Sequence, residues 1–382
     1  MNSFKFFADK PLSKYRTADS SIIILTLLMW GIGMFTLYFS SGATGGKGEV
    51  LFNDSLYFVK RQFISSMIGF VLMFFLAVVN LEFLKGKLPY IVLAAIILCL
   101  CVYIPHFGIS RNGARRWIRI PLLGSFQPSE AVKLVVVLYL AKYFDWQYKQ
   151  PKEKRTLIPG IISLFIFTFV VLIQKDFSTS VFVFALGLSI FFVSGARLAW
   201  MVPALVTVVP LGGLFILLDE YRLKRIIGFI NPDDFQNDLN YQITYAKRAI
   251  MNGGLWGQGF GSGLVKTGGI PEVQSDYIFA GWVEATGFVG VIIYMALLAL
   301  FTWRCMKVAM TVFDRFMSLM VFGFVVAISG QSLLNLAVVA SVLPSTGVPL
   351  PFFSSGGSSI MVTLGMCGLI INASRFTGAE DE

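Results

Sequence analysis

Long apolar runs alternate with short polar segments along almost the whole chain. An α-helix of about 20 apolar residues crosses the hydrocarbon core of a bilayer. The pattern therefore predicts an all-α, polytopic membrane protein with about ten transmembrane helices, forming one membrane domain over residues 1–382. The predicted spans are 21–39, 63–81, 88–104, 129–143, 157–174, 179–194, 199–218, 278–301, 316–339 and 359–373. A long polar segment, about 219–277, precedes the eighth span.

Composition supports this class and excludes several others. Of the 382 residues, 56% are hydrophobic and only 14% are charged, which excludes an ordinary soluble domain. The single histidine, His106, cannot build a histidine-rich metal site and argues against a Ser-His-Asp triad. The four cysteines lie in or beside apolar runs, so neither a disulfide framework nor a zinc site is predicted. The net charge is +10, and the basic residues lie in loops between the spans. This distribution indicates contact with membrane lipid rather than with nucleic acid.

Basic residues are concentrated in the N-terminal segment and in alternate loops. They are Lys5, Lys10, Lys14, Arg16, Lys85, Lys87, Lys149, Lys152, Lys154, Arg155, Arg197, Arg304, Lys307 and Arg315. Loops of this kind face the cytoplasm in most membrane proteins. We therefore expect a multi-pass protein of the cytoplasmic (inner) membrane, with both termini in the cytoplasm and segment 219–277 outside. The first apolar run is a full span, so no cleavable signal is predicted.

Two segments on the predicted outer side are basic as well. Segment 105–128 carries Arg111, Arg115, Arg116 and Arg119, and segment 219–277 adds Arg222, Lys224, Arg225, Lys247 and Arg248. An error in the topology, or charges that are merely tolerated, would also explain the first segment. Guanidinium groups bind phosphate with two parallel hydrogen bonds. The functional interpretation is therefore a site for a phosphorylated lipid.

Asp276 stands at the mouth of the eighth span, after a glycine-rich run at 253–263. Ionisable residues at membrane depth are costly and tend to be functional. Glycines allow positive φ or a close approach of the backbone to a ligand. The alternative is a flexible loop whose Asp276 only caps the next helix. We favour the functional interpretation, because several polar groups converge on this helix mouth.

Other polar residues lie in or beside the spans. Glu130 and Lys133 share one helix face and can pair, either as a structural ion pair or in contact with substrate. Asp176 caps the next helix unless it faces the same cavity as Asp276. Gln331 and Asn335, four residues apart, are expected to form hydrogen bonds across helices.

A loop at 343–359 contains three prolines, which exclude a helix and stiffen the backbone. Ser354 and its neighbouring serines offer hydroxyl donors there. Glu284, deeper in the eighth span, is more readily explained as a buried packing anchor than as a second cavity group.

Several motifs occur in a defined order along the chain. They are NGARRWI (112–118), QPSEAVK (127–133), QKDFST (174–179), GGLWGQG (253–259), PEVQSDYIFA (271–280) and the proline-rich loop. Together they resemble the SEDS family (shape, elongation, division and sporulation), the FtsW/RodA/SpoVE type of peptidoglycan glycosyltransferase. WGQG, YQIT and the GGSS ending are more similar to the division branch, FtsW-like, than to the rod-elongation branch.

The resemblance implies ten helices, an outward-facing cavity and polymerisation of lipid II into glycan strands. The essential acid of the family corresponds to Asp276, its glutamate–lysine pair to Glu130 and Lys133, and its second cavity aspartate to Asp176. Family members work with a class B penicillin-binding protein, a transpeptidase, so such a partner is expected. Ser275, Lys175 and Ser355 depart from the usual residues without removing the acid or the pair.

The predicted chemistry has Asp276 as general base and Arg116, Lys133 and Arg225 beside the departing pyrophosphate. Glu272 and Asp176 are expected to orient sugars or to help hold a divalent cation, Mg²⁺ or Mn²⁺, although no metal-ligand motif is visible. One alternative is a lipid II flippase, a transporter that would be expected to contain inverted repeats; none is found. Another is a non-catalytic scaffold for a transpeptidase, in which Asp276 would be dispensable.

Overall fold

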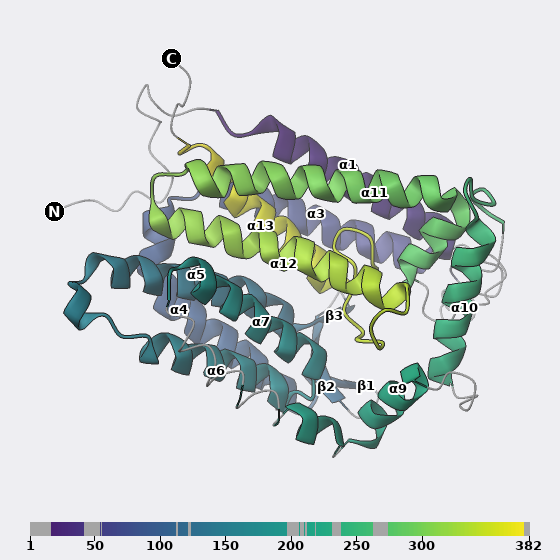
Figure 1. Cartoon of the computed structure of the whole chain (residues 1–382), viewed down its shortest axis with the longest axis horizontal. Helices are drawn as coiled ribbons and strands as arrows, with labels where there is room; N and C mark the ends of the chain where they lie inside the picture. Colours follow the sequence, from purple (N-terminus) through teal and green to yellow (C-terminus); the bar gives the residue numbers. More distant parts are fainter. Residues whose placement is uncertain are drawn as a thin grey trace.

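The computed structural model describes residues 17–41, 54, 56–111, 114–120, 124–196, 206, 210, 212–217, 219–230, 238–262 and 274–377. Most helices run side by side in one elongated bundle, and α10 lies across one end of it (Figure 1). The helices are α1 (Ser20–Ser41), α3 (Tyr57–Val78), α4 (Leu81–Leu100), α5 (Pro128–Lys149), α6 (Ile158–Ile173), α7 (Phe177–Val193), α9 (Glu220–Ile230), α10 (Asp238–Gly253), α11 (Ile278–Thr311), α12 (Arg315–Val339) and α13 (Gly357–Ser374). Short 3₁₀ turns lie at Cys101–Tyr103 and Lys152–Lys154.

The helices agree with the predicted spans wherever the chain is described. Within the described residues, six helices are long and apolar enough to cross a membrane, and α6 and α7 are shorter apolar helices. Helix α5 is more polar than these and covers the fourth predicted span. The seventh predicted span, 199–218, lies largely outside the described residues, and the described part at 212–217 is helical. The polytopic helical fold is confirmed, and the total of ten spans stays a prediction.

The helices differ in how much of their surface faces other helices. In the most apolar stretch of α13, 94% of residues are buried, against 22% in α3. Helix α3 instead exposes Val71 and Phe74, each at 71%. An apolar helix that exposes one side while packing the other is expected where lipid is the solvent. Helix α13 is therefore the innermost helix, and α3 contributes a lipid-facing surface.

Small residues allow α3 and α13 to approach closely. A Cβ added to Gly368 would lie 2.4 Å from the Met73 carbonyl oxygen, and one at Gly69 would lie 2.7 Å from the Leu364 Cδ1 atom. Close backbone approach is the usual basis of helix association in membranes, because lipid tails are as apolar as the helix surfaces.

A three-stranded antiparallel sheet occupies the segment between α4 and α5. It consists of β1 (Gly108–Arg111), β2 (Ala114–Ile120) and β3 (Gly124–Phe126), in the order β1-β2-β3. Ile109 pairs with Trp117, and Arg119 pairs with Ser125. From the sequence we expect a basic loop between two helices here, so the sheet is a departure from that expectation. Each strand is short, and each finds its backbone partners within the same segment.

Helix α11 is broken at Gly287, where φ is 68°. The glycine-rich run at the end of α10 packs against this break. The Gln258 and Gly259 amides donate to the Glu284 and Ala285 carbonyl oxygens at 2.9 and 3.0 Å. In return, the Phe288 amide donates to the Gly254 carbonyl oxygen at 2.9 Å. The run therefore satisfies the backbone groups that the break leaves without helical partners.

The close approach of glycine backbone predicted from the sequence is thus present, but its partner is the chain's own helix. A Cβ at Gly257 would lie 2.2 Å from the Ala285 carbonyl oxygen, and one at Gly287 would lie 2.4 Å from the Gly257 nitrogen. No side chain fits at either contact. In the described part of the run, the glycines allow the segment after α10 to pack directly against the break in α11.

Replacing Gly287 with alanine is expected to destabilise the protein strongly. At φ 68° and ψ −162° the backbone adopts a conformation that is essentially restricted to glycine and costs another residue about 1–3 kcal/mol, and the new methyl group would also displace the docked run. The measurement is the melting temperature of the purified protein in detergent. Gly31→Ala is the control, because Gly31 lies in α1 with nothing within 4 Å of the added methyl group. Equal melting temperatures for the two variants would contradict the role of Gly287.

Candidate active site

Two amide side chains on α12 connect the principal candidate residues. The Asn335 Nδ2 group donates to the Asp276 carbonyl oxygen at 3.0 Å and to the Val348 carbonyl oxygen at 2.9 Å. The Gln331 Nε2 group donates to the Pro349 carbonyl oxygen at 2.8 Å. Residues four apart lie on one helix face, separated by about 6 Å along the axis. The predicted hydrogen bonds across helices are confirmed, and they join α12 to the acid and to the proline-rich loop.

The carboxylate of Asp276 faces that loop. Its Oδ2 atom lies 3.6 Å from the position that a Cβ of Gly347 would occupy. Gly347 has a φ of 71° and leaves this space open. Tyr277, not Asp276, is the N-cap residue of α11, and the cap side chain forms no capping hydrogen bond. The alternative of Asp276 as a simple helix cap is therefore wrong, and its side chain remains partly exposed.

Glu130 and Lys133 form the predicted ion pair on α5. The Lys133 Nζ atom lies 2.8 Å from Glu130 Oε2, and the two residues are only 2% and 3% exposed. Lys133 also donates to Gln331 Oε1 at 2.5 Å and lies 5.8 Å from the centre of the Phe182 ring. A buried pair must offset the desolvation of both charges, and further hydrogen bonds make this feasible. The Gln331 side chain thus forms hydrogen bonds with both Lys133 and the proline-rich loop.

Asp176 is buried in a second polar cluster at the start of α5. Its Oδ2 atom accepts hydrogen bonds from Gln127 Nε2 at 2.7 Å and from Ser129 Oγ at 3.0 Å. Arg116 on β2 places Nη1 3.6 Å from Asp176 Oδ1. Asp176 occupies the N-cap position of α7 but forms no side-chain cap. The predicted capping role is therefore wrong, and the carboxylate instead joins α7 to α5 and the sheet.

Two arginines of α9 extend these clusters. The Arg225 Nη1 group donates to the Ser345 carbonyl oxygen at 3.2 Å, close in sequence to Gly347. Arg222 lies 3.3 Å from Asp219 and 5.2 Å from the centre of the Phe177 ring. Burial lowers the pKa of Arg222, Asp219 raises it, and Arg116 lowers it further. In the sequence Arg222 is one basic residue among several, and its electrostatic interaction with Arg116 could not be predicted from the sequence.

The proline-rich loop is held from several sides. The Gln62 side chain on α3 donates to the Ser354 carbonyl oxygen at 2.9 Å, and the Ser355 amide donates to the Gln274 carbonyl oxygen at 2.8 Å. A Cβ at Gly33 on α1 would lie 2.3 Å from the Phe352 carbonyl oxygen. The expectation of a non-helical, conformationally defined loop is confirmed.

Ser354 and Glu272 are the two remaining residues of the predicted site. Ser354 is buried, and its Oγ atom accepts a hydrogen bond from the Leu350 amide at 2.8 Å. Its hydroxyl therefore stabilises the loop, and a contact with substrate stays a prediction. Glu272 lies outside the described residues. Among the described residues, no group of three or more histidine, cysteine, aspartate or glutamate side chains could hold a metal ion.

Comparison with known proteins shows the family to which the chain belongs. The sequence matches the cell cycle protein family of FtsW, RodA and SpoVE over residues 19–379. It is 32% identical over 368 residues to stage V sporulation protein E of Bacillus subtilis (strain 168), covering 96% of this chain and 99% of that protein. It is 33% identical over 362 residues to the probable peptidoglycan glycosyltransferase FtsW of Borreliella burgdorferi, covering 93% and 95% of the two chains.

Solved structures show the same fold. A chain of a peptidoglycan synthase complex, described for its structural coordination of polymerization and crosslinking, matches with a TM-score of 0.76 and 26% identity, over 94% of this chain and 98% of that one. The rod shape determining protein RodA of Thermus thermophilus matches with a TM-score of 0.69 and 23% identity, over 94% and 97% of the two chains. With motifs, family match and fold in agreement, the chain belongs to the FtsW, RodA and SpoVE family, the SEDS proteins.

Proposed function

We propose that this protein is a peptidoglycan glycosyltransferase that polymerises lipid II into glycan strands at the outer face of the cytoplasmic membrane. One observation carries the assignment of the base. Glu130 and Asp176 are each only 3% exposed, whereas Asp276 is partly exposed at the mouth of α11. A general base must reach the proton that it removes. Of these three carboxylates, Asp276 is the one with access to substrate.

In the proposed reaction, Asp276 accepts the proton of the acceptor sugar's 4-hydroxyl group. The freed oxygen attacks the anomeric carbon of the donor, and the bond from that carbon to the lipid pyrophosphate breaks. The leaving group takes the bonding electrons and departs as an anion. One base and a phosphate leaving group favour a single displacement with inversion, by analogy with inverting glycosidases.

Arginine side chains that the structure holds in place are suited to the departing pyrophosphate. Arg116 is held by Asp176, and Arg225 is held by the Ser345 carbonyl oxygen. Guanidinium groups fixed in advance stabilise charge as it develops. Lys133 is paired with Glu130, so we assign it a supporting role: it positions Gln331 and adds positive potential.

The role of a divalent cation in this reaction stays a prediction. The described carboxylates do not form a dedicated metal cage, and Asp176 already accepts from Gln127 and Ser129. Mg²⁺ is often held by one or two carboxylates together with substrate phosphates. Assaying the reaction with Mg²⁺, with Mn²⁺ and with a chelator tests whether the pyrophosphate brings such an ion.

The proposed assembly follows from the relatives. One solved relative belongs to a complex that coordinates polymerization with crosslinking. We therefore propose a class B penicillin-binding protein, a transpeptidase, as partner, and lipid II and membrane lipid as ligands. Placement in the division branch and a cytoplasmic location for both termini are part of the same proposal. The Asp19 amide donates to Ser374 Oγ at 3.0 Å, so α1 begins and α13 ends on the same side.

Replacing Asp276 with asparagine is expected to reduce polymerisation by about 10²–10⁴-fold, the usual contribution of a general base. The assay measures glycan polymer from purified lipid II in liposomes that contain no other synthase. Asp54→Asn is the matched control: this carboxylate is partly exposed, pairs with Lys60 at 2.8 Å and accepts from the Leu56 amide at 2.9 Å, and such surface pairs contribute little. If the Asp276 variant keeps substantial activity, Asp276 is not the general base. A folded chain that moves lipid II without forming polymer would support the flippase.

Exchanging the charges of Glu130 and Lys133 tests their ion pair. Breaking a buried pair by changing one partner costs about 3–5 kcal/mol, so Glu130→Lys and Lys133→Glu are each expected to lower the melting temperature. The double variant should recover part of this loss. Recovery is expected to be partial, because Gln331 Oε1 accepts a hydrogen bond from Lys133. If the double variant is the least stable of the three, the two residues do not act as a pair.

A further inference from the structure

A cavity lies between α4 and α5, away from the candidate active site. It is a groove of about 370 Å³, within the range of roughly 300–1,000 Å³ that is typical of small-molecule sites. Its walls are mainly apolar and aromatic, with one charged side chain. The lining residues are Leu88, Pro89, Val92, Tyr139, Lys142, Tyr143 and Trp146.

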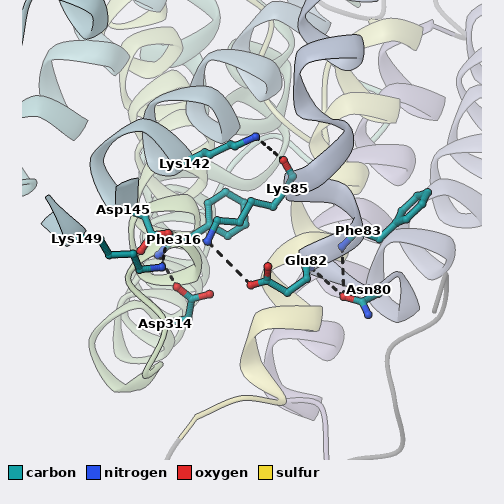
Figure 2. Close-up of polar contacts among 9 residues, drawn as sticks. All are labelled: Asn80, Glu82, Phe83, Lys85, Lys142, Asp145, Lys149, Asp314 and Phe316. Carbon is teal, nitrogen blue, oxygen red and sulfur yellow. Dashed lines mark hydrogen bonds and ion pairs between the residues drawn. The ribbon is translucent and has the colours of Figure 1, made fainter. Parts of the chain in front are cut away.

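The groove and the candidate active site lie toward opposite ends of α5. Ser129, which contacts Asp176, stands in the first turn of α5, and Lys142 follows 13 residues later, about 20 Å along the helix. Lys85, Asp145 and Lys149 form an ion-pair network beside it (Figure 2). Basic residues at this end led us to predict that it faces the cytoplasm.

Aromatic side chains mark the level of the membrane surface at this end. Trp146 is 51% exposed and Tyr90 is 68% exposed. Tryptophan and tyrosine concentrate where the headgroups meet the hydrocarbon core. Lys87, which is also exposed, lies 5.5 Å from the centre of the Tyr90 ring. The apolar groove therefore opens into the hydrocarbon region just below a basic, aromatic rim.

Lys142 provides positive charge to this groove. Its Nζ atom donates to the Lys85 carbonyl oxygen at 2.7 Å, as Figure 2 shows. The nearby carboxylate, Asp145, instead accepts from Lys85 at 2.6 Å and Lys149 at 3.0 Å. Within the described residues, Lys142 has no carboxylate in ion-pair distance. An ammonium group has three hydrogens to donate, so Lys142 can also bind an anion.

We propose that this groove binds an anionic phospholipid of the cytoplasmic leaflet. One acyl chain lies along the apolar wall formed by Leu88, Val92 and Tyr139, and the phosphate meets Lys142 at the rim. Basic pockets between membrane helices on the cytoplasmic side bind acidic lipid headgroups in this way. The headgroup of lipid II must instead reach Asp276 near the other end of the bundle. The proposal depends on the predicted topology and not on the chemistry of Asp276.

Native mass spectrometry of the detergent-purified full chain tests this proposal. The protein is titrated with equimolar phosphatidylglycerol and phosphatidylethanolamine that carry identical acyl chains. The expected result is one retained lipid, with about fivefold preference for phosphatidylglycerol, the factor that one lysine contributes at an acidic membrane surface. Lys142→Gln should abolish the preference and Lys142→Arg should keep it. Lys149→Gln is the matched control and should also keep it, because Lys149 is exposed and paired with Asp145.

A variant that fills the groove distinguishes binding in the groove from non-specific attraction of acidic lipid to the basic surface. Val92→Trp changes no charge and should reduce retention of both lipids, and size-exclusion chromatography confirms that each variant is folded. Equal retention of the two lipids by the wild-type protein would overturn the proposal. Unchanged preference in Lys142→Gln would overturn it too. Because neither readout involves polymer formation, failure here leaves the assignment of Asp276 untouched.

Discussion

The hydrogen bonds of Asn335 and Gln331 are the constraint on which the site depends. The two amides lie on one face of α12 and hold the carbonyl oxygens of Asp276, Val348 and Pro349 together with the Lys133 ammonium group. An unpaired buried polar group costs about 1–3 kcal/mol, so each member keeps the others in place. Through these bonds, α5, α12, the start of α11 and the proline-rich loop form one unit.

Much of the fold and part of the site could be predicted from the sequence. Apolar runs located the helices because membrane spans have a minimum length, and α12 (Arg315–Val339) agrees closely with the predicted 316–339. The Glu130–Lys133 pair followed from spacing on a single helix. Such predictions succeed because the information is local: both partners, or the whole pattern, lie within one element.

The parts that could not be predicted depend on contacts between distant segments. Asp176 looked like a helix cap, yet its partners Gln127 and Ser129 come from another helix, almost 50 residues away. The glycine run looked like a ligand loop, yet it pairs with the break in α11 at Gly287. The sheet left only a faint signal in the sequence, because only Ile118, Arg119 and Ile120 alternate between apolar and polar, and this run is too short to outweigh the apolar spans around it.

A reaction at a membrane surface needs fixed geometry where the hydrophobic effect contributes little. Lipid tails offer apolar side chains about as much as other helices do, so close packing and buried hydrogen bonds must specify the structure. Gly33 brings α1 against the Phe352 carbonyl oxygen, while Gln62 on α3 binds the carbonyl oxygen of Ser354. The loop that faces Asp276 is thereby supported from the lipid-facing side of the bundle as well as from α12. Support of the loop from both sides helps to keep the partly exposed Asp276 at one position, which its proposed role as general base requires.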